Sequence, residues 1–456
     1  MVRILLALAL FCVTGASVTA NQIDTLKYRI SFTDKKGTPY SINKPEDFLS
    51  AKSIERRNKQ GVKITETDLP VSLNYINEVK KHGINIILTG KWDNFVTIST
   101  NDLNKIDQIT KLPFVKQVEL VWKASESDLN PKTPERNTIL NQMEKKDNYY
   151  GVGEDQIKIS NGDKLHEAGF KGQGMTIAVI DAGYHNMDLI TGMKNINVLG
   201  TKDFVNPNSD IYAENSHGMS VLSCIAMNQP YYMVGTAPEA SFWLLRSEDE
   251  SSEHLVEQDY WAAAVEFADS VGVDIVSTSL GYNSFDDASK NYEYRNLDGK
   301  YSLMSRQASL MASKGLLLVC SAGNSGSGPW KKITVPGDAT DIITVGAIGV
   351  NGVLANFSSI GNTADNRVKP DVVAVGFRSS VMGTDGNLTK ANGTSFSGPT
   401  ITGLMAILWQ SLPNLTVYEL IDLVHKSSDR SEYPDNIYGY GVPDVWKAYQ
   451  TGKPNQ

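Results

Sequence analysis

The stretch "GMTIAVIDAG", residues 174–183, decides the fold class of this chain. Its apolar run is short and nearly continuous, which is typical of a strand buried on both faces of a sheet. Helix candidates separate several runs of this kind, so we predict an α/β domain with a mostly parallel sheet and helices on both faces. The further strand candidates are "SFWLLRS" (241–247), "VDIVSTSLG" (273–281), "GLLLVCSAG" (315–323), "DIITVGAIG" (341–349) and "PDVVAVG" (370–376), and the clearest helix candidates are residues 254–272 and 302–315.

The segment before this domain has a different rhythm, which predicts a separate small α+β domain. Its apolar spacing changes in the order strand, helix, helix, strand, strand, helix, strand, beginning with "LKYRISF" at residues 26–32. The chain then becomes polar and includes Pro131 and Pro134, a composition typical of a linker. The predicted organisation is a leader at 1–20, the α+β domain at 21–122, a linker at 123–154 and the α/β domain at 155–456.

The leader, "MVRILLALALFCVTGASVTA", has the composition of a secretory signal peptide. One Arg precedes a short apolar run, and small residues end at Ala20. The run is shorter than the roughly 20 apolar residues that a spanning helix requires, and no other segment approaches that length. We therefore expect a secreted protein, periplasmic or extracellular, without a membrane span after signal removal; a retained anchor is the alternative.

Charge and cysteine content narrow the possible functions. The chain has 43 Lys and Arg against 51 Asp and Glu, a formal charge of −8, which argues against a nucleic-acid partner held by counterion release. Only Cys224 and Cys320 remain after signal removal. Both lie in apolar contexts, so a disulfide and two buried free thiols stay open as alternatives.

Four polar side chains stand where apolar segments begin or end. Asp181 ends the strand at 174–183, and Asn324 lies in the loop "CSAGNSGSGP" after another strand. His217, in "NSHGMSV", and Ser395, in "KANGTSFSGP", each come just before an apolar helix candidate. Each residue alone fits a structural role in a turn or a cap. Together they supply the acid, base, nucleophile and oxyanion donor of acyl transfer.

The predicted helix starts bear on how two of these residues would act. At the positive end of a helix dipole an imidazolium is disfavoured, so we expect a neutral, proton-accepting His217. At Ser395 the free backbone amides would stabilise negative charge on an attacked carbonyl oxygen. The small residues around this serine would let a peptide backbone come close.

These segments resemble those of the subtilisin-like serine peptidases. "IAVIDAG" is similar to the family's Asp segment, "HGMSV" to its His segment, "SAGN" to its oxyanion Asn segment and "NGTSFSGP" to its Ser segment. They occur in the family's order, and weaker similarities extend the resemblance over roughly residues 172–441. The resemblance implies a serine endopeptidase that hydrolyses peptides or proteins through an acyl-enzyme intermediate.

The resemblance also implies a role for each residue. Ser395 would be the nucleophile, His217 the general base and Asp181 the group that orients the imidazole. The Asn324 side chain and the Ser395 backbone N–H would hold the oxyanion. Substrate would pair as an extra strand with the segment Ser279, Leu280 and Gly281.

The N-terminal α+β domain is similar in size and rhythm to the inhibitory propeptides of this family. The resemblance implies that it covers the active site and assists folding until the chain is cleaved between residues 123 and 150. The domain would then be an intramolecular partner of the enzyme.

Other classes of protein fit less well. A non-catalytic binding protein on the same scaffold would lack a triad group, and none is missing. A trypsin-type order, with His217, Asp274 and Ser325, conflicts with the α/β rhythm, because that fold is all-β. An α/β-hydrolase requires G-x-S-x-G, and the spacing in "GTSFSG" does not match it. A sedolisin-like enzyme uses a Glu base, and the His217 segment argues against that class. Departures from the family pattern at Ala182, Met219, Ser220, Phe396 and Ser397 remove no triad atom and bear on pocket shape and rate.

The implied chemistry needs no cofactor. Members of the family often bind structural Ca²⁺, and the acidic stretch at residues 285–299 could contribute ligands. Its spacing matches no defined calcium loop, so an acidic surface insertion is the simpler interpretation and no metal ligand is assigned.

Overall fold

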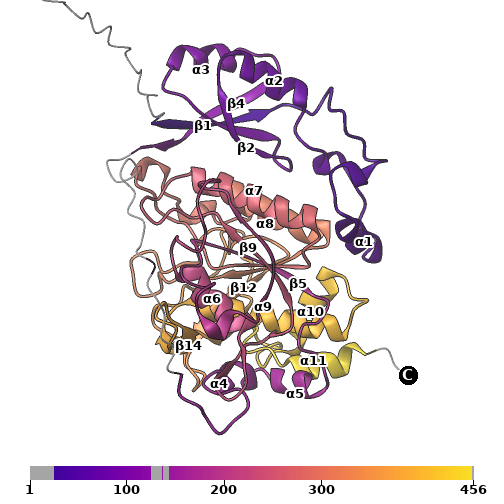
Figure 1. Ribbon diagram of the computed structural model, residues 1–456, viewed down its shortest axis with the longest axis vertical. Coiled ribbons are helices and arrows are strands. Elements are labelled where there is room, and N and C mark those ends of the chain that lie inside the picture. The colour runs from indigo at the N-terminus through magenta and orange to yellow at the C-terminus, as the bar shows by residue number, and fades with distance from the viewer. Residues whose placement is uncertain (1–24, 125–135, 137–142, 454–456) are drawn as a thin grey trace, which may run out of the picture.

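The computed structural model describes residues 25–124, 136 and 143–453, which form a small N-terminal domain and a larger α/β domain (Figure 1). The predicted signal peptide lies outside these residues, as do residues 125–135 and 137–142 of the predicted linker. Within the described part of the chain, no helix combines the length and the apolar content needed to cross a membrane.

The N-terminal domain is a four-stranded antiparallel sheet in the order β2-β3-β1-β4 with helices packed on it. Its chain order is strand, helix, helix, strand, strand, helix, strand, so the predicted order is confirmed. A buried apolar cluster between sheet and helices includes Ile30, Val79 and Ile98. The elements are β1 (Leu26–Phe32), α1 (Ala51–Lys59), α2 (Leu73–Lys81), β2 (Asn85–Gly90), β3 (Phe95–Ser99), α3 (Leu103–Thr110) and β4 (Val115–Lys123).

The α/β domain is built on a seven-stranded parallel sheet in the order β13-β12-β11-β10-β5-β9-β6. The predicted fold class is therefore confirmed. The strands are β5 (Thr176–Asp181), β6 (Asn197–Asp203), β9 (Ser241–Arg246), β10 (Ile275–Thr278), β11 (Leu317–Ser321), β12 (Ile343–Ile348) and β13 (Val372–Val375). All six predicted strands are present, but β6 was not predicted. It lies at the sheet edge and is largely exposed, so it lacks the continuous apolar run of a buried strand.

Helices cover both faces of this sheet (Figure 1). One face packs its apolar side chains with α6 (His217–Ala226), α9 (Thr394–Ser411), α10 (Val417–Ser427) and α11 (Val445–Gly452). The other face packs against α7 (Val256–Val271) and α8 (Leu303–Met311). The smaller elements are α4 (Glu154–Lys158), α5 (Gly162–Glu167), and the antiparallel pairs β7 (Asn228–Gln229) with β8 (Met233–Val234) and β14 (Ser379–Met382) with β15 (Leu388–Ala391).

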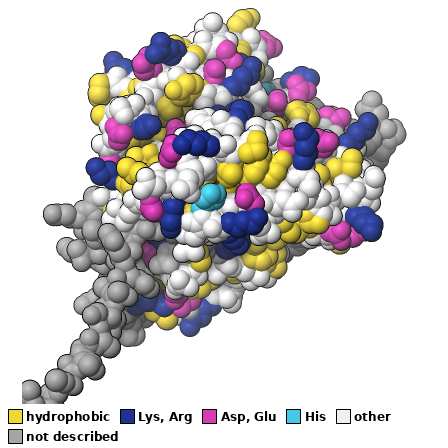
Figure 2. Space-filling view, turned by 90° about the horizontal axis from the view of Figure 1, so that it is seen from above, with side chains coloured by type: hydrophobic (Ala, Val, Ile, Leu, Met, Phe, Trp, Pro, Cys, Tyr) yellow, Lys and Arg dark blue, Asp and Glu magenta, His cyan; other side chains and the backbone are white. Residues whose placement is uncertain are grey.

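The N-terminal domain lies over α7 and α8 (Figure 1). Phe95 of β3 packs against Ala262 of α7 and Leu303 of α8, and Arg29 of β1 pairs with Asp259 of α7. Seen from above, the molecule carries interspersed basic and acidic side chains and no large area of a single sign (Figure 2).

Candidate active site

Three of the predicted site segments lie at one edge of the parallel sheet. Asp181 is the last residue of β5, Ser279 directly follows β10, and Asn324 lies three residues after β11. The strands β5, β10 and β11 are neighbours in the sheet. Functional groups of open α/β sheets gather at the carboxyl ends of the strands, and here the topology brings these three together.

Helix α6 supplies the imidazole that meets Asp181. The helix begins at His217, whose backbone N–H donates to Asn215 Oδ1 at 2.7 Å, so the Asn215 side chain satisfies the first free N–H of the helix. His217 Nδ1 lies 2.7 Å from Asp181 Oδ1, and the Asp181 side chain is fully buried. Gly218 permits this close approach, because a Cβ there would lie 2.8 Å from the Asp181 Cβ.

The ionisation of His217 differs from the sequence-based expectation. Burial lowers the pKa of His217, but the adjacent Asp181 carboxylate and the more distant Glu250 and Glu248 raise it to about 8. The prediction that the helix start keeps this imidazole neutral is therefore wrong for the full chain. A hydrogen-bonded carboxylate at contact distance outweighs the partial charge of a helix end.

The predicted nucleophile lies inside helix α9 rather than just before it. The helix begins at Thr394, so Ser395 is its second residue, and the residue is 7% exposed. Pro399 has no backbone N–H and cannot donate to the Ser395 carbonyl four residues earlier. Ser279 Oγ donates to that carbonyl oxygen instead, at 3.1 Å. The substrate segment and the nucleophile helix are joined through this bond.

Asn324 is oriented by the residue before Ser395. Its Oδ1 accepts from the Thr394 backbone N–H at 2.9 Å and from Thr394 Oγ1 at 3.0 Å. Because both bonds go to the carbonyl oxygen, the Asn324 amide nitrogen is left to point elsewhere. A Cβ placed on Gly393 would lie 3.7 Å from this nitrogen, so the Asn324 amide nitrogen lies beside the start of α9.

His217 lies near the residue that follows Ser395 but forms no direct bond with the serine. The His217 ring centroid lies 6.1 Å from that of Phe396, the residue after Ser395. Among the described residues no hydrogen bond joins Ser395 Oγ to the imidazole. Catalytic hydrogen bonds are often long in the free enzyme and shorten with substrate, so this geometry is compatible with proton transfer.

The segment Ser279, Leu280 and Gly281 is open along its backbone. In the described chain, the main-chain groups of Leu280 and Gly281 form no hydrogen bond to another backbone group. Tyr282 then pairs with Val335 through N–H to carbonyl bonds of 2.9 and 3.0 Å. Glycine is required at 281, because a Cβ there would lie 2.2 Å from Thr334 Oγ1. An extended peptide could pair with the open backbone.

The two remaining cysteines are free and buried. Burial raises the pKa of each thiol to about 12, so neither is a reactive nucleophile. Of the alternatives left open by the sequence, the structure selects free thiols. In the acidic stretch at 285–299, Asp287 Oδ1 accepts from the Ser289 N–H and Asp298 Oδ1 from the Lys300 N–H, so both carboxylates close local turns.

A parallel α/β sheet with an Asp–His pair at its carboxyl edge and a serine at the start of a buried helix fits the class of hydrolases with a serine nucleophile. Comparison with known proteins identifies which one: residues 172–441 match the Subtilase family, and residues 27–138 match the Peptidase S8 propeptide domain of Bacteroidota. The chain belongs to the subtilase family, and its N-terminal domain is a propeptide domain. It is therefore a serine endopeptidase.

Curated relatives cover different shares of the chain. Subtilisin DY of Bacillus licheniformis is 27% identical over 297 residues, which are 64% of this chain and 97% of the relative. Serine protease AprX of Bacillus subtilis strain 168 is 29% identical over 304 residues, 59% of this chain and 65% of the relative. Subtilisin E of the same strain is 28% identical over 307 residues, which are 66% of this chain and 71% of the relative.

Two groups of residues escaped the sequence reasoning. Thr394 was regarded only as a small neighbour of Ser395, although its two bonds orient Asn324. The carboxylates Asp259, Glu266 and Asp269 lie in the predicted helix 254–272 and were given no role there, yet all are buried beneath the propeptide domain. Their spacing of seven and then three residues, which places them on one helix face, was the available signal.

Proposed function

We propose that this subtilase cleaves peptide bonds with Ser395 as nucleophile, His217 as general base and Asp181 as the orienting carboxylate. The 2.7 Å contact between His217 Nδ1 and the buried Asp181 Oδ1 carries the proposal. Asp181 accepts the Nδ1 proton, which leaves the Nε2 lone pair to take a proton. The neutral imidazole is the active form.

The reaction follows from these positions. His217 Nε2 removes the Ser395 hydroxyl proton as Oγ attacks the scissile carbonyl carbon, and Asp181 stabilises the imidazolium. The Ser395 backbone N–H, free because it lies in the first helical turn, and the Asn324 side-chain N–H donate to the new oxyanion. His217 then protonates the leaving amine. Water, activated by the same imidazole, hydrolyses the acyl-enzyme.

Substrate would lie as an added strand along Ser279, Leu280 and Gly281, whose backbone groups are open. The bond from Ser279 Oγ to the Ser395 carbonyl oxygen holds this strand in register with the nucleophile. The scissile carbonyl would thus be positioned by backbone pairing, and side-chain pockets would select the sequence.

We propose that the propeptide domain inhibits the enzyme until it is removed. The end of β4, at Trp122, Lys123 and Ala124, lines a pocket together with Phe285, whose ring stacks on Tyr282, the residue after Gly281. The described end of β4 therefore lies near the residues that follow the proposed substrate segment. The composition of residues 1–20 supports export as part of the same proposal.

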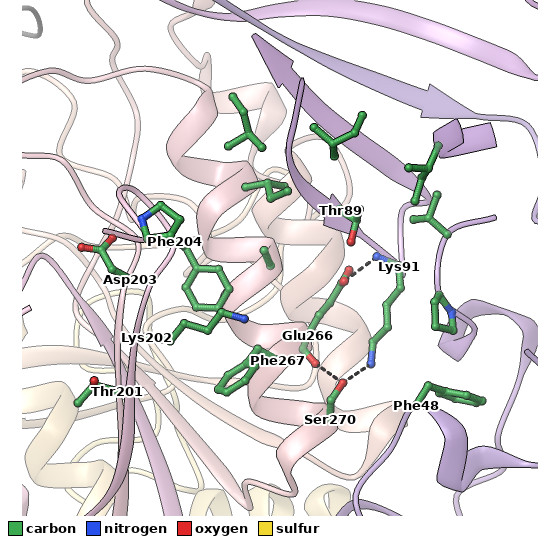
Figure 3. A pocket seen from close by; sticks show the side chains of 18 of the residues that line it. Phe48, Thr89, Lys91, Thr201, Lys202, Asp203, Phe204, Glu266, Phe267 and Ser270 are labelled. Atoms are coloured by element: carbon green, nitrogen blue, oxygen red, sulfur yellow. Dashed lines mark hydrogen bonds between the residues drawn. The ribbon is translucent and has the colours of Figure 1, made fainter. Parts of the chain in front are cut away.

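A cleft of about 930 Å³ marks the seam between the two domains (Figure 3). Lys91 Nζ donates to Ser270 Oγ at 2.9 Å, and the Lys91 and Trp92 backbone N–H groups donate to Glu266 at 2.6 and 2.8 Å. The seam is thus held by polar contacts and is incompletely filled. This construction suits a domain that must later separate.

Active-site labelling with a serine phosphonate tests the proposed roles. The released enzyme should form one adduct on Ser395, and Ser395→Ala should form none. Ser397→Ala is a matched control, since Ser397 is a buried helix serine that only bonds the Thr394 carbonyl oxygen. Asn324→Ala should keep the adduct site but lower kcat by about 10²–10³, the loss measured for this donor in subtilisin.

The alternative is a non-catalytic binding protein on the same scaffold. A well-folded released protein without an adduct on Ser395, and without cleavage of a peptide library, would favour that alternative.

A further inference from the structure

Three glutamates converge beside the region of the substrate segment. Glu248 follows β9, Glu253 lies in the next loop, and Glu257 is in the first turn of α7. One carboxylate oxygen of each lies within 4.8 Å of the other two. None of them belongs to the acidic stretch 285–299 that the sequence suggested as a source of metal ligands.

Glu257 is the unusual member of this glutamate cluster. Glu257 is only 1% exposed, and neither of its carboxylate oxygens has a hydrogen-bond partner. The Asp249 backbone favours the ionised form but does not offset the burial, which raises the pKa of Glu257 well above its ordinary value. Glu248 is also buried and accepts only from the Tyr282 hydroxyl. In the described chain no Lys, Arg or His forms an ion pair with any of the three.

Elsewhere in the described chain, buried carboxylates such as Asp338 and Glu266 accept hydrogen bonds, and others contact cations. Asp269 contacts Arg56 and Arg57, Asp371 contacts Lys369, and Asp259 contacts Arg29. A buried carboxylate without a partner costs several kcal/mol or more, which is why such groups are paired or coordinate metals. The glutamate cluster departs from the pattern of its own molecule, and a bound cation would restore it.

We propose that Glu248, Glu253 and Glu257 bind one Ca²⁺ ion. The cluster offers only oxygen, the donor that Ca²⁺ prefers, and contains no His or Cys ligand of the kind that selects Zn²⁺. Oxygens 2.3–2.6 Å from one ion lie at most about 5 Å apart, so the observed 4.8 Å limit accommodates a common ion. Water or backbone oxygens would complete the six to eight ligands.

The ion would join three parts of the α/β domain. Glu257 anchors the start of α7, Glu253 the loop before it, and Glu248 connects through the Tyr282 hydroxyl to the residue that follows Gly281. Loading with Ca²⁺ should therefore stiffen the end of the proposed substrate segment. The binding itself does not depend on the proposed catalytic roles.

Calorimetric titration of the full chain tests the proposal. Ser395→Ala would be used throughout to prevent self-digestion, and each protein would be stripped with chelator and titrated with CaCl₂. We expect Glu257→Gln and Glu253→Gln to lose one Ca²⁺ per chain or to weaken it at least tenfold. Glu250→Gln, which removes an exposed charge from the same loop, should change the affinity less than threefold. Ca²⁺ should also raise the thermal midpoint of the parent more than that of Glu257→Gln.

The stoichiometry makes the test decisive even if other Ca²⁺ sites exist. Parental stoichiometry and affinity in both glutamine variants would overturn the proposal, as would a parent that binds no Ca²⁺ at millimolar concentration. Glu253 is partly exposed, so its variant decides the question if Glu257→Gln fails to fold.

Discussion

The two faces of helix α7 contrast in chemistry although they share one stretch of chain. The face toward the parallel sheet is apolar, with Trp261, Val265 and Ala268 packed against the strands. The face toward the propeptide domain carries Asp259, Ala262, Glu266 and Asp269. Its apolar content is a small patch where Ala262 meets Phe95 and Leu303.

This difference separates a permanent contact from a removable one. Apolar surface buried against the sheet would gain nothing by exposure. Charges buried between two domains each regain water when the domains part, which offsets much of the loss of their partners. Asp269, which meets Arg56, Arg57 and Lys91, would be an exposed surface carboxylate on the released enzyme. Helix α7 is thus built to stay in the enzyme and to let the propeptide domain go.

The largest expected effect tests the inner face. Trp261 is fully buried, and its Nε1 donates to Thr278 Oγ1 of β10 at 3.0 Å. Trp261→Ala should lower the free energy of unfolding by about 3–5 kcal/mol, through lost burial and the cavity left behind. Denaturant unfolding should reveal this loss in both the full chain and the released enzyme. A loss confined to the full chain would break the comparison.

The next effect tests the outer face. Asp269→Asn leaves the buried guanidinium groups of Arg56 and Arg57 without their shared carboxylate, although Arg57 keeps Asp68. Breaking a buried pair costs about 3 kcal/mol or more, so docking of the propeptide domain should weaken by about that amount. The released enzyme should change by less than about 0.5 kcal/mol, the usual range for surface substitutions. Equal destabilisation of both forms, measured by the same unfolding experiment, would contradict separable faces.

A smaller effect concerns pH. Burial raises the pKa of Glu266 to about 7, despite Lys91 and two backbone N–H groups that favour the charged form. On the released enzyme this carboxylate would face water with a pKa near the ordinary 4.5. The docked state holds the proton more tightly, so docking is most favourable below pH 4.5 and weakens as pH rises through about 7.

Amide exchange measures this pH effect at the contact itself. In full-chain Ser395→Ala, protection of the Lys91 and Trp92 amides should fall between pH 5 and 8 by about one to two orders of magnitude, after correction for intrinsic exchange. Adding Glu266→Gln should flatten the dependence, because the titrating group is gone. A parent whose protection is constant over this range would count against the raised pKa.

The smallest effect tests an exposed pair at the same seam. Arg306 Nε lies 3.1 Å from Asp93 Oδ1, with side chains 40% and 26% exposed. Arg306→Ala should weaken docking by less than about 1 kcal/mol, since solvent screens such pairs. If Arg306→Ala lowered the thermal midpoint of the full chain as much as Asp269→Asn does, the number of charge pairs, and not their burial, would set the strength of the interface.

Sequence reasoning was most reliable where one pattern decided one element. The apolar runs predicted six of the seven parallel strands because a strand buried on both faces has no polar positions. Edge strand β6 alternates between exposed and partly buried positions. It has no continuous apolar run, so the same criterion missed it. Ser395 was predicted to lie just before the apolar helix, whereas α9 begins at Thr394 and accommodates Pro399 by replacing one backbone bond with the Ser279 hydroxyl.

The sequence alone determined the family, the parallel α/β class and the candidates Asp181, His217, Asn324 and Ser395, since each stands beside a local motif that can be read in order along the chain. Only the tertiary structure decided which charged groups lie in contact with one another. Helix-end reasoning predicted a neutral His217, but the carboxylate 36 positions earlier raises its pKa to about 8. Likewise, the outer face of α7 meets cations more than 150 residues earlier in the chain. Electrostatic interactions depend on distance and burial in space, and neither is written in the local pattern.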